Sequence, residues 1–546
     1  MTMLVSRFRI PCFAALFIAL SLSMLESRAD AIDAEARTIS LAMSTEPPTL
    51  NSLVSTNVIS SFVLGHVMEG LLQYDEQQQL QEAVAERWQL TETGAHFWLR
   101  ADAKWSDGQP VTAHDFVFAW QQVVNPKTAS PYAFIMFPIK HAERIQRGEL
   151  TIDKLGVRAV NDRELVVDFE RPCPYFLSLT AFMSYYPLRE DWYLKTGQRY
   201  AADKEDMLYN GAFALAEWVH GAHLSLTKNP HYWQRDKVYL NRIDIPYITP
   251  DLSAQFNLFQ DRQIALVSLD RETLSEAMAK GYSIKKFHTG AQYFLSLNFR
   301  QGHLTEHHLF RKALQAIFNP EILVNKVLGV PGNLPGESLF PITVKGIKGR
   351  FRDEYPAPRI ARGLSLARSY LQQLKAQLQT ERLPEVVLLA GDSPRAAREA
   401  EYLQYLLQQG LGLRVKIDAQ MFKQYIEKMR RGEFDIAVAG WGPDFDDAIT
   451  FGDLFSSWNQ NNRGQYRSEE YDYWVRVAEN SSDQQQRMAA MNELQNIIAE
   501  DVVIIPSFES GSLYVQQPAL QGVVRRLFGP DPDFKFARIV SDEAQP

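Results

Sequence analysis

A turn followed directly by an amphipathic helix, in residues 104–132, constrains the fold of this chain more than any other feature. The Ser-Asp-Gly sequence at 106–108 favours a turn, and Pro110 keeps the residue before it extended. Thr112 can accept hydrogen bonds from first-turn amides, and Asp115 completes a capping pattern while complementing the helix dipole. We therefore expect a helix that begins at Thr112.

This expected helix has one apolar face, and Asn125 followed by Pro126 ends it. Such a face must pack against another element, so the residues by themselves predict a well-capped helix on a sheet and assign no function. The face consists of Phe116, Val117, Trp120, Val123 and Val124.

The chain is long enough for two or three domains and has the composition of a soluble globular protein. It contains 546 residues, of which 46% are hydrophobic and 22% are charged. The formal net charge of -8 argues against a nucleic-acid partner, because phosphate binding requires clustered Lys and Arg. We expect no nucleic acid to bind.

Residues 1–31 have the order of a secretory signal peptide. Arg7 and Arg9 precede an apolar run at 10–25, and the Ala-Asp-Ala sequence at 29–31 offers a cleavage site between small residues. A membrane anchor is the weaker alternative, because the run is shorter than the roughly 20 apolar residues of a spanning helix. We expect the leader to be removed from a soluble secreted form.

The two cysteines predict neither a lipid anchor nor a disulfide. Cys12 lies at the start of the apolar run, whereas a lipoprotein leader places its cysteine after the run. Cys173 would then be the one cysteine of the mature chain, which leaves it without an internal partner even in an oxidising compartment. Its place between two prolines favours a buried apolar role over a nucleophilic one.

Alternating strand and helix patterns in the second half predict an α/β domain. Residues 69–188 instead indicate an α+β unit inserted into the rest, with the helix above and a strand at 165–169. In the second half we expect strands at 386–389, 414–417, 434–439 and 502–505, and helices at 395–408, 422–430 and 485–499.

Several short sequences resemble those of the oligopeptide-binding proteins of bacterial ABC importers. The residues of 105–132 resemble the family in WSDG, in D-F-V and W, and in NPKTASPY, and further matches follow in the family's order over essentially the whole mature chain. These further matches are EGLL at 69–72, NGAF at 210–213, VNKV at 324–327 and GW at 440–441.

The resemblance implies an α/β, two-lobed periplasmic-binding-protein fold (type II, cluster C) with an additional inserted α+β domain. The lobes would be joined by crossover strands and would enclose the ligand between them. The implied division is a signal peptide at 1–31, lobe I at 32–68, 189–290 and 511–546, the extra domain at 69–188, and lobe II at 291–510.

No catalytic motif is visible in the sequence. It contains no G-x-S-x-G, no H-E-x-x-H, no paired C-x-x-C and no Walker A sequence. His303, His307 and His308 form the one histidine cluster, and a solvated helix start explains it better than a metal site does. We expect no enzymatic activity, no metal and no cofactor.

A binding site is better supported, at Gly440–Asp444 directly after the strand expected at 434–439. Ligands of open α/β sheets lie outside the carboxyl ends of the strands. Gly440 and Gly442 would permit close backbone approach, Trp441 offers an aromatic wall, and Asp444 offers a negative charge. From the residues alone Asp444 could equally be a turn or cap residue. The resemblance implies that it is the aspartate that binds a peptide's terminal ammonium.

The resemblance also implies further site residues, and this chain departs from the family's pattern in two places. The family's cysteine pair falls at Ala291 and Gly442. The arginine that grips the carboxylate of a short peptide falls at Val438, and its histidine neighbour falls near Ala396. Arg395 or Arg398 could compensate, although an exposed helix start is the plainer role for either. The implied site residues are Thr56, Asn57 and Val58 on a strand-like segment beside the peptide backbone, Tyr132 at the cleft wall, and Phe422 in place of a pocket tryptophan.

We therefore interpret the chain as a monomeric periplasmic protein that closes around an oligopeptide and delivers it to an inner-membrane ABC permease. Backbone hydrogen bonds and roomy, partly wet pockets would accept varied sequences. Two alternatives stay open. The ligand could be specialised, as a cell-wall peptide, an antimicrobial peptide or a metal complex is, or the chain could be a secreted hydrolase.

Overall fold

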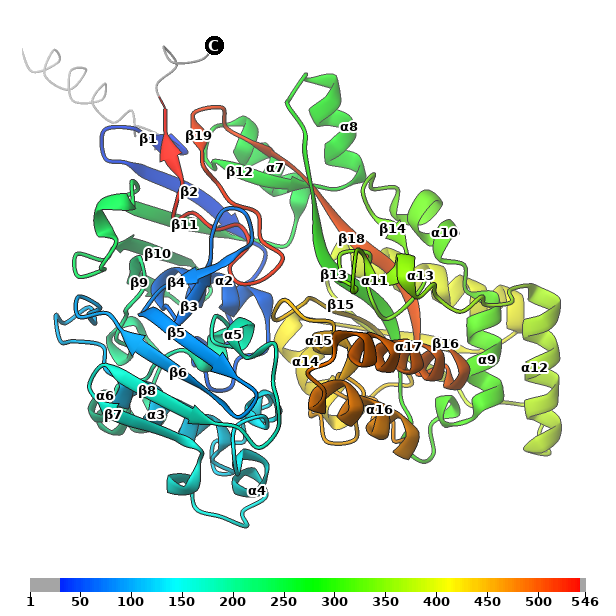
Figure 1. The fold of residues 1–546 in the computed structure, drawn as a ribbon. Coiled ribbons are helices and arrows are strands. Elements are labelled where there is room, and N and C mark those ends of the chain that lie inside the picture. Colours follow the sequence, from blue (N-terminus) through cyan, green and yellow to red (C-terminus); the bar gives the residue numbers. More distant parts are fainter. Residues whose placement is uncertain (1–29, 541–546) are drawn as a thin grey trace, which may run out of the picture.

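The computed structural model describes residues 30–540, and two long strands organise them. β13 (Lys285–Leu297) and β18 (Ile504–Gln516) pair antiparallel and run diagonally from one half of the molecule to the other (Figure 1). The predicted leader, residues 1–31, lies outside the described residues except for its last two positions, and Cys12 lies outside them too. Within 30–540 no helix is both long and apolar enough to cross a membrane.

A five-stranded sheet with the order β1-β2-β11-β10-β9 lies in one half of the molecule. The N-terminal strand β2 pairs in parallel with β11, Ile39 opposite Ile243, so distant segments of the chain build this sheet together. Its elements are β1 (Ile32–Asp33), β2 (Thr38–Met43), β9 (Phe213–Val219), β10 (His223–Lys228) and β11 (Arg242–Ile248), with α2 (Val58–Val67) beside it.

An antiparallel sheet with the order β5-β6-β8-β7 follows in the chain and carries the predicted helix. The expected start of this helix is confirmed, since Thr112 is the N-cap of α3 (Ala113–Val124). Asp115 Oδ2 accepts hydrogen bonds from Thr112 N (2.8 Å) and from Nε1 of the buried Trp105 (3.2 Å). The other elements are β3 (Leu72–Tyr74), β4 (Leu80–Glu82), β5 (Ala85–Thr91), β6 (Gly94–Leu99), α4 (Ala142–Gln146), β7 (Val157–Asn161), β8 (Glu164–Asp168), α5 (Phe176–Leu179) and α6 (Glu190–Thr196).

The other half of the molecule contains the main part of a seven-stranded sheet, which follows the order β12-β18-β13-β17-β15-β16 with β14 paired to β18. β15 pairs in parallel with β16 and β17, as an α/β pattern requires. The elements are α7 (Leu252–Gln260), β12 (Leu266–Leu269), α8 (Arg271–Ala279), α9 (His308–Ile317), α10 (Pro320–Ile322), β14 (Leu334–Pro335), α11 (Phe351–Glu354), α12 (Leu364–Gln377), β15 (Val386–Gly391), α13 (Pro394–Tyr405), β16 (Val415–Gln420), α14 (Phe422–Arg431), β17 (Ile436–Trp441), α15 (Ile449–Gly452), α16 (Glu469–Asn480) and α17 (Gln484–Asp501).

The predicted strands in this half differ from the observed ones at their ends, and β15 and β16 both extend beyond the predicted last residue, to Gly391 and Gln420. The strand expected at 434–439 runs from Ile436 to Trp441, because its pairing with β13 continues to Trp441 opposite Gln292. The strand expected at 502–505 begins only at Ile504, because Val502 adopts a left-handed conformation (φ 51°) that ends α17. After β18 the chain returns to the first half, where β19 (Leu520–Gln521) pairs with β20 (Arg538–Ile539).

Candidate functional site

The two halves of the molecule meet where Tyr132 contacts Asp444. Tyr132 lies in the segment after α3, and its side chain is buried. Its hydroxyl donates to Asp444 Oδ1 at 2.9 Å, across 312 residues of sequence. The Asp444 amide donates in turn to Thr450 Oγ1 (3.0 Å), which fixes the loop after β17. The fold therefore brings together two side chains that the sequence analysis placed in one site.

The Asp444 carboxyl has an unusual electrostatic environment. Burial raises its pKa to about 8, and the hydrogen bond from Tyr132 offsets only part of that effect. Burial also raises the pKa of the Tyr132 phenol, and the nearby Asp444 carboxylate raises it further. Among residues 30–540 no Lys, Arg or His lies within 4.0 Å of Asp444 as an ion-pair partner. Burial without a cationic partner among these residues therefore favours the protonated form of the Asp444 carboxyl at neutral pH.

Trp441 and Gly442 lie beside this pair, but Gly440 has a different role from the expected one. Gly440 and Trp441 are the last residues of β17 rather than part of the turn after it. A Cβ at Gly440 would lie 2.6 Å from the Tyr293 ring, so this glycine is required for packing, whereas a Cβ at Gly442 would meet open space. The Trp441 and Tyr132 ring centroids are 6.5 Å apart. Within the described chain, the buried Nε1 atom of Trp441 has no hydrogen-bond partner.

A cavity of about 700 Å³ separates the N-terminal segment from α14. Of the predicted site residues, Thr56 and Asn57 line it from one side and Phe422 lines it from the other. The remainder of the lining is Pro48, Thr49, Val54, Ser55, Ala129 and Pro131 opposite Lys423, Gln424, Ile426, Glu427, Arg430 and Gln460. Since the two walls come from the two halves of the chain, this is an interlobe cavity.

The strand-like segment expected at 56–58 is wrong. Asn57 is the N-cap of α2 and its Oδ1 accepts from Ser60 N at 2.8 Å, while Val58 is the first helical residue. Asparagine is among the residues that N-caps prefer, and the short apolar pattern that follows did not distinguish a strand from a helix. The Val58 side chain is 72% exposed and does not line the cavity, so it offers no strand edge there.

Arg395 and Arg398 already have acidic partners. Arg395 Nη1 lies 3.2 Å from Oε2 of the fully buried Glu399, and its guanidinium lies 4.3 Å from the centroid of the Tyr293 ring. Arg398 Nη2 donates to both carboxylate oxygens of Glu272 on α8, at 3.0 and 2.8 Å. Neither side chain lines the interlobe cavity.

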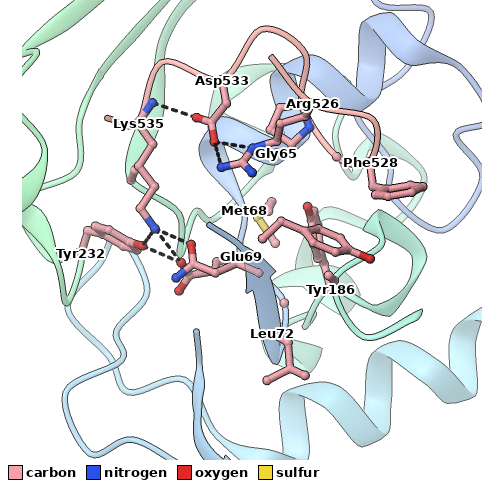
Figure 2. A pocket seen from close by; sticks show the side chains of 17 residues that line it. Gly65, Met68, Glu69, Leu72, Tyr186, Tyr232, Arg526, Phe528, Asp533 and Lys535 are labelled. Carbon is pink, nitrogen blue, oxygen red and sulfur yellow. Dashed lines mark hydrogen bonds and ion pairs between the residues drawn. The ribbon is translucent and has the colours of Figure 1, made fainter. Parts of the chain in front are cut away.

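The EGLL sequence at 69–72 holds a buried charge network that sequence reasoning missed (Figure 2). Lys535 Nζ lies 3.4 Å from Glu69 Oε1 and 2.6 Å from the Tyr232 hydroxyl, and Arg526 Nη2 lies 2.7 Å from Asp533 Oδ2. These pairs tie the C-terminal segment to the start of the inserted unit around a cavity of only about 50 Å³. Because the charges satisfy one another, the network is structural.

The histidine cluster at 303–308 and Cys173 have structural roles. His303 Nδ1 lies 2.9 Å from Asp435 Oδ1, and His308 Nε2 lies 3.0 Å from the Glu500 carbonyl oxygen. His307 is the N-cap of α9, so the three histidines have separate surroundings. Cys173 is buried, and burial raises the pKa of its thiol, which disfavours the nucleophilic thiolate.

Comparison with known proteins identifies relatives over nearly the whole chain. The family model of the bacterial extracellular solute-binding proteins, family 5 Middle, matches residues 79–463. The oligopeptide-binding protein OppA of Bacillus subtilis (strain 168) is 28% identical over 502 residues, which cover 89% of this chain and 90% of that protein.

Solved structures of peptide-binding proteins have the same fold over nearly the whole chain. The substrate-binding domain of an oligopeptide ABC transporter from Bacillus anthracis str. Ames aligns with a TM-score of 0.88 and 30% identity, covering 93% of this chain and 99% of that one. Listeria monocytogenes OppA bound to peptide aligns with a TM-score of 0.87 and 26% identity, covering 92% and 99%. The expected two-lobed type II fold is thereby confirmed.

Proposed function

We propose that this chain, which belongs to the family 5 bacterial extracellular solute-binding proteins, captures peptides between its two lobes and delivers them to an ABC importer. The observation that carries the proposal is the interlobe cavity together with the Asp444 carboxyl, which has no cation partner among residues 30–540. A peptide brings a terminal ammonium to that carboxyl and an extended backbone to the cavity.

Asp444 is the proposed ammonium-binding residue. Its carboxyl is held by the Tyr132 hydroxyl, and loss of water around the pair strengthens its attraction for a cation. Polar groups of the cavity wall would bind the peptide backbone, directly or through water, which accepts many sequences. The proposed ligand-binding residues are Asp444, Trp441, Gly442, Tyr132, Phe422, Thr56, Asn57, Val58 and Arg395. Of these, Thr56, Asn57 and Phe422 line the interlobe cavity, and the other six do not.

Release and capture would use a hinge in the β13–β18 pair. The proposed lobe boundaries at 290/291 and 510/511 fall inside these strands, where the register shifts between His288 and Gln292. Gly290 has a positive φ of 73°, and a Cβ at Gly511 would lie 2.2 Å from the Gly332 carbonyl oxygen. Glycines at a break in strand pairing can absorb a backbone rotation, which favours hinge closure here.

The cellular setting is part of the proposal. The leader at 1–31 would direct a monomer to the periplasm, where the closed lobes would present a surface to an inner-membrane permease. The family is a class of binding proteins, and the buried thiol of Cys173 offers no reactive nucleophile.

Mass spectrometry of the ligand that copurifies with the protein tests this function. We expect intact peptides that survive prolonged incubation with the protein, and an Asp444→Asn variant purified in parallel should carry far less of them. Peptides that are consumed during incubation would identify a hydrolase instead. A copurifying compound without a peptide backbone would contradict the proposed ligand class.

A further inference from the structure

A short segment of the inserted unit packs against the half of the molecule that contains the seven-stranded sheet. This segment, residues 171–175 with the sequence RPCPY, lies between β8 and α5. Arg171 Nη2 donates to Glu479 Oε2 on α16 at 2.9 Å, across 308 residues of sequence. The Tyr175 ring stacks on Phe445, with ring centroids 5.7 Å apart and an angle of 10° between the planes. A charged contact and an aromatic contact therefore join the two halves at the RPCPY segment.

The ion pair between Arg171 and Glu479 is largely shielded from water. The two side chains are only 14% and 7% exposed. Burial raises the pKa of the Glu479 carboxyl, and the Arg171 guanidinium offsets part of that rise. Removal of one partner would leave the other charge buried without compensation, whereas separation of the two halves would return both charges to water. The pair therefore favours contact between the halves only while both charges are present.

The surface that receives the RPCPY segment is held in place by Arg487 of α17. Its Nη1 and Nη2 atoms donate to the two carboxylate oxygens of Asp447 at 2.9 and 2.6 Å, and its Nε atom donates to the Ala478 carbonyl oxygen at 3.0 Å. The same guanidinium lies 5.1 Å from the centroid of the Tyr175 ring, which adds a cation–π contact. Because Ala478 precedes Glu479, Arg487 fixes the part of α16 that meets the segment.

The RPCPY segment itself is fixed to the half of the molecule that contains the five-stranded sheet. At the start of the inserted unit, Glu69 pairs with Lys535 at 3.4 Å (Figure 2). The Glu69 backbone also exchanges two hydrogen bonds with the Asn210 side chain, at 3.0 and 2.9 Å. Pro172 and Pro174 restrict the backbone of the segment. Its contact with α16 and α17 is therefore one between two preorganised surfaces, and opening of the proposed hinge would break it.

We propose that the RPCPY segment and the surface of α16 and α17 form an interlobe latch, which holds the two halves together from outside the interlobe cavity. Neither Arg171 nor Glu479 lines that cavity. The latch raises the affinity for any ligand that binds between the closed halves, because release of the ligand requires the halves to separate. It does not contribute to the choice of ligand. The inference goes beyond the proposed function, and only its affinity measurement rests on that function.

Hydrogen exchange of the ligand-free protein tests the latch without a peptide. Arg171→Gln should accelerate amide exchange in the last turn of α16 about tenfold, because the halves separate more often. Glu479→Gln should accelerate exchange in the RPCPY segment and α5 by a similar factor. Each effect appears in the half that does not carry the substitution, so a local loss of structure around the substituted residue would not produce it.

Stopped-flow binding of the peptide Ala-Glu-Ala-Ala-amide measures the effect on ligand release. Either single variant should weaken the affinity about tenfold or more, mainly through faster dissociation, since the latch forms after the ligand has entered. The double variant Arg171→Gln/Glu479→Gln should weaken it no more than the more severe single variant does, because neither charge is then left buried without a partner.

Arg158→Gln is the matched control. It removes the same charge from the inserted unit, at an ion pair with Asp168 in which the side chains are 56% and 49% exposed. It should match the parent in both measurements. Urea unfolding of each variant shows whether it folds, and if one single variant does not, the other single variant and the double variant carry the test.

Exchange at the parent's rate in both single variants overturns the latch, whatever the peptide result. Equally fast exchange in Arg158→Gln would indicate a general effect of charge and would overturn it too. Accelerated exchange with unchanged peptide affinity refutes the effect of the latch on ligand release. If exchange changes as expected but the parent does not bind the peptide, the latch stands and the proposed function fails.

Discussion

Peptide binding by this protein should depend on pH in a way that reports directly on Asp444. Burial raises the pKa of its carboxyl to about 8, so at neutral pH the group is mostly protonated. An ammonium in the cleft requires the carboxylate, and binding below pH 8 must therefore release the proton from Asp444. The ligand's own α-amino group has a pKa of about 7.7–8.0 and must be protonated to bind.

These two protonation requirements determine how much the affinity changes with pH. At pH 6 roughly 1% of the Asp444 carboxyl is ionised while nearly all peptide amines are charged, and at pH 8 roughly half of each group is in the required state. The product of the two fractions, and with it the affinity, should rise roughly 20-fold from pH 6 to pH 8. Above pH 8 the affinity should fall again, because the peptide amine loses its proton.

Titration calorimetry in two buffers of different ionisation enthalpy measures the protons exchanged on binding. At pH 7 we expect a net release of about 0.8 proton per peptide, because the proton leaving Asp444 outweighs the small uptake by the amine. At pH 9 we expect a net uptake of about 0.8 proton, because the amine must then be recharged. The sign of the exchange should therefore reverse near pH 8.

An Asp444→Asn variant supplies the matched control, because it keeps the shape of the side chain and removes its titration. It should bind weakly and should release no proton at pH 7. A parent protein that exchanges no protons at either pH, or an Asp444→Asn variant with the parent's proton release, would refute the placement of the ammonium at Asp444.

The remaining predictions concern the site, the leader and the fold. Asp444→Ala should weaken binding by about 3–5 kcal/mol, and N-acetylation of the peptide should cause a loss that does not add to it, both measured by calorimetry. Intact mass of the periplasmic protein should show removal of the leader, and a membrane-bound form that retains Met1 would contradict this. Val438 cannot bind a carboxylate, so the affinity for alanine peptides of increasing length should not be highest for the tripeptide. A maximum at the tripeptide that is lost when its carboxylate is amidated would contradict the reasoning. Asp115→Ala should lower the free energy of unfolding by about 1–3 kcal/mol in urea titrations, since it removes the acceptor of the Thr112 amide at the start of α3 and leaves Trp105 Nε1 buried and unsatisfied. An unchanged midpoint would count against that role.

Local signals predicted the structure well where neighbouring residues decide it. The start of α3 follows from the capping by Thr112 and Asp115, and the helical spacing of α14 and α17 fixed their places to within a few residues. The end of β17 was missed because its last residues, Gly440 and Trp441, are strand only through pairing with β13.

The site could be predicted only in part, because its charges are balanced by contacts far apart in the sequence. The residues next to Arg398 in the sequence do not indicate its ion pair with Glu272, which lies 126 residues away.

A crystal structure of the protein with Ala-Glu-Ala-Ala-amide tests the central claim most directly. Our account predicts that the peptide lies in the interlobe cavity with its terminal nitrogen about 3 Å from an Asp444 carboxylate oxygen, beside the Tyr132 hydroxyl. A peptide bound in the reverse direction, or one whose amino terminus lies away from Asp444, would contradict it.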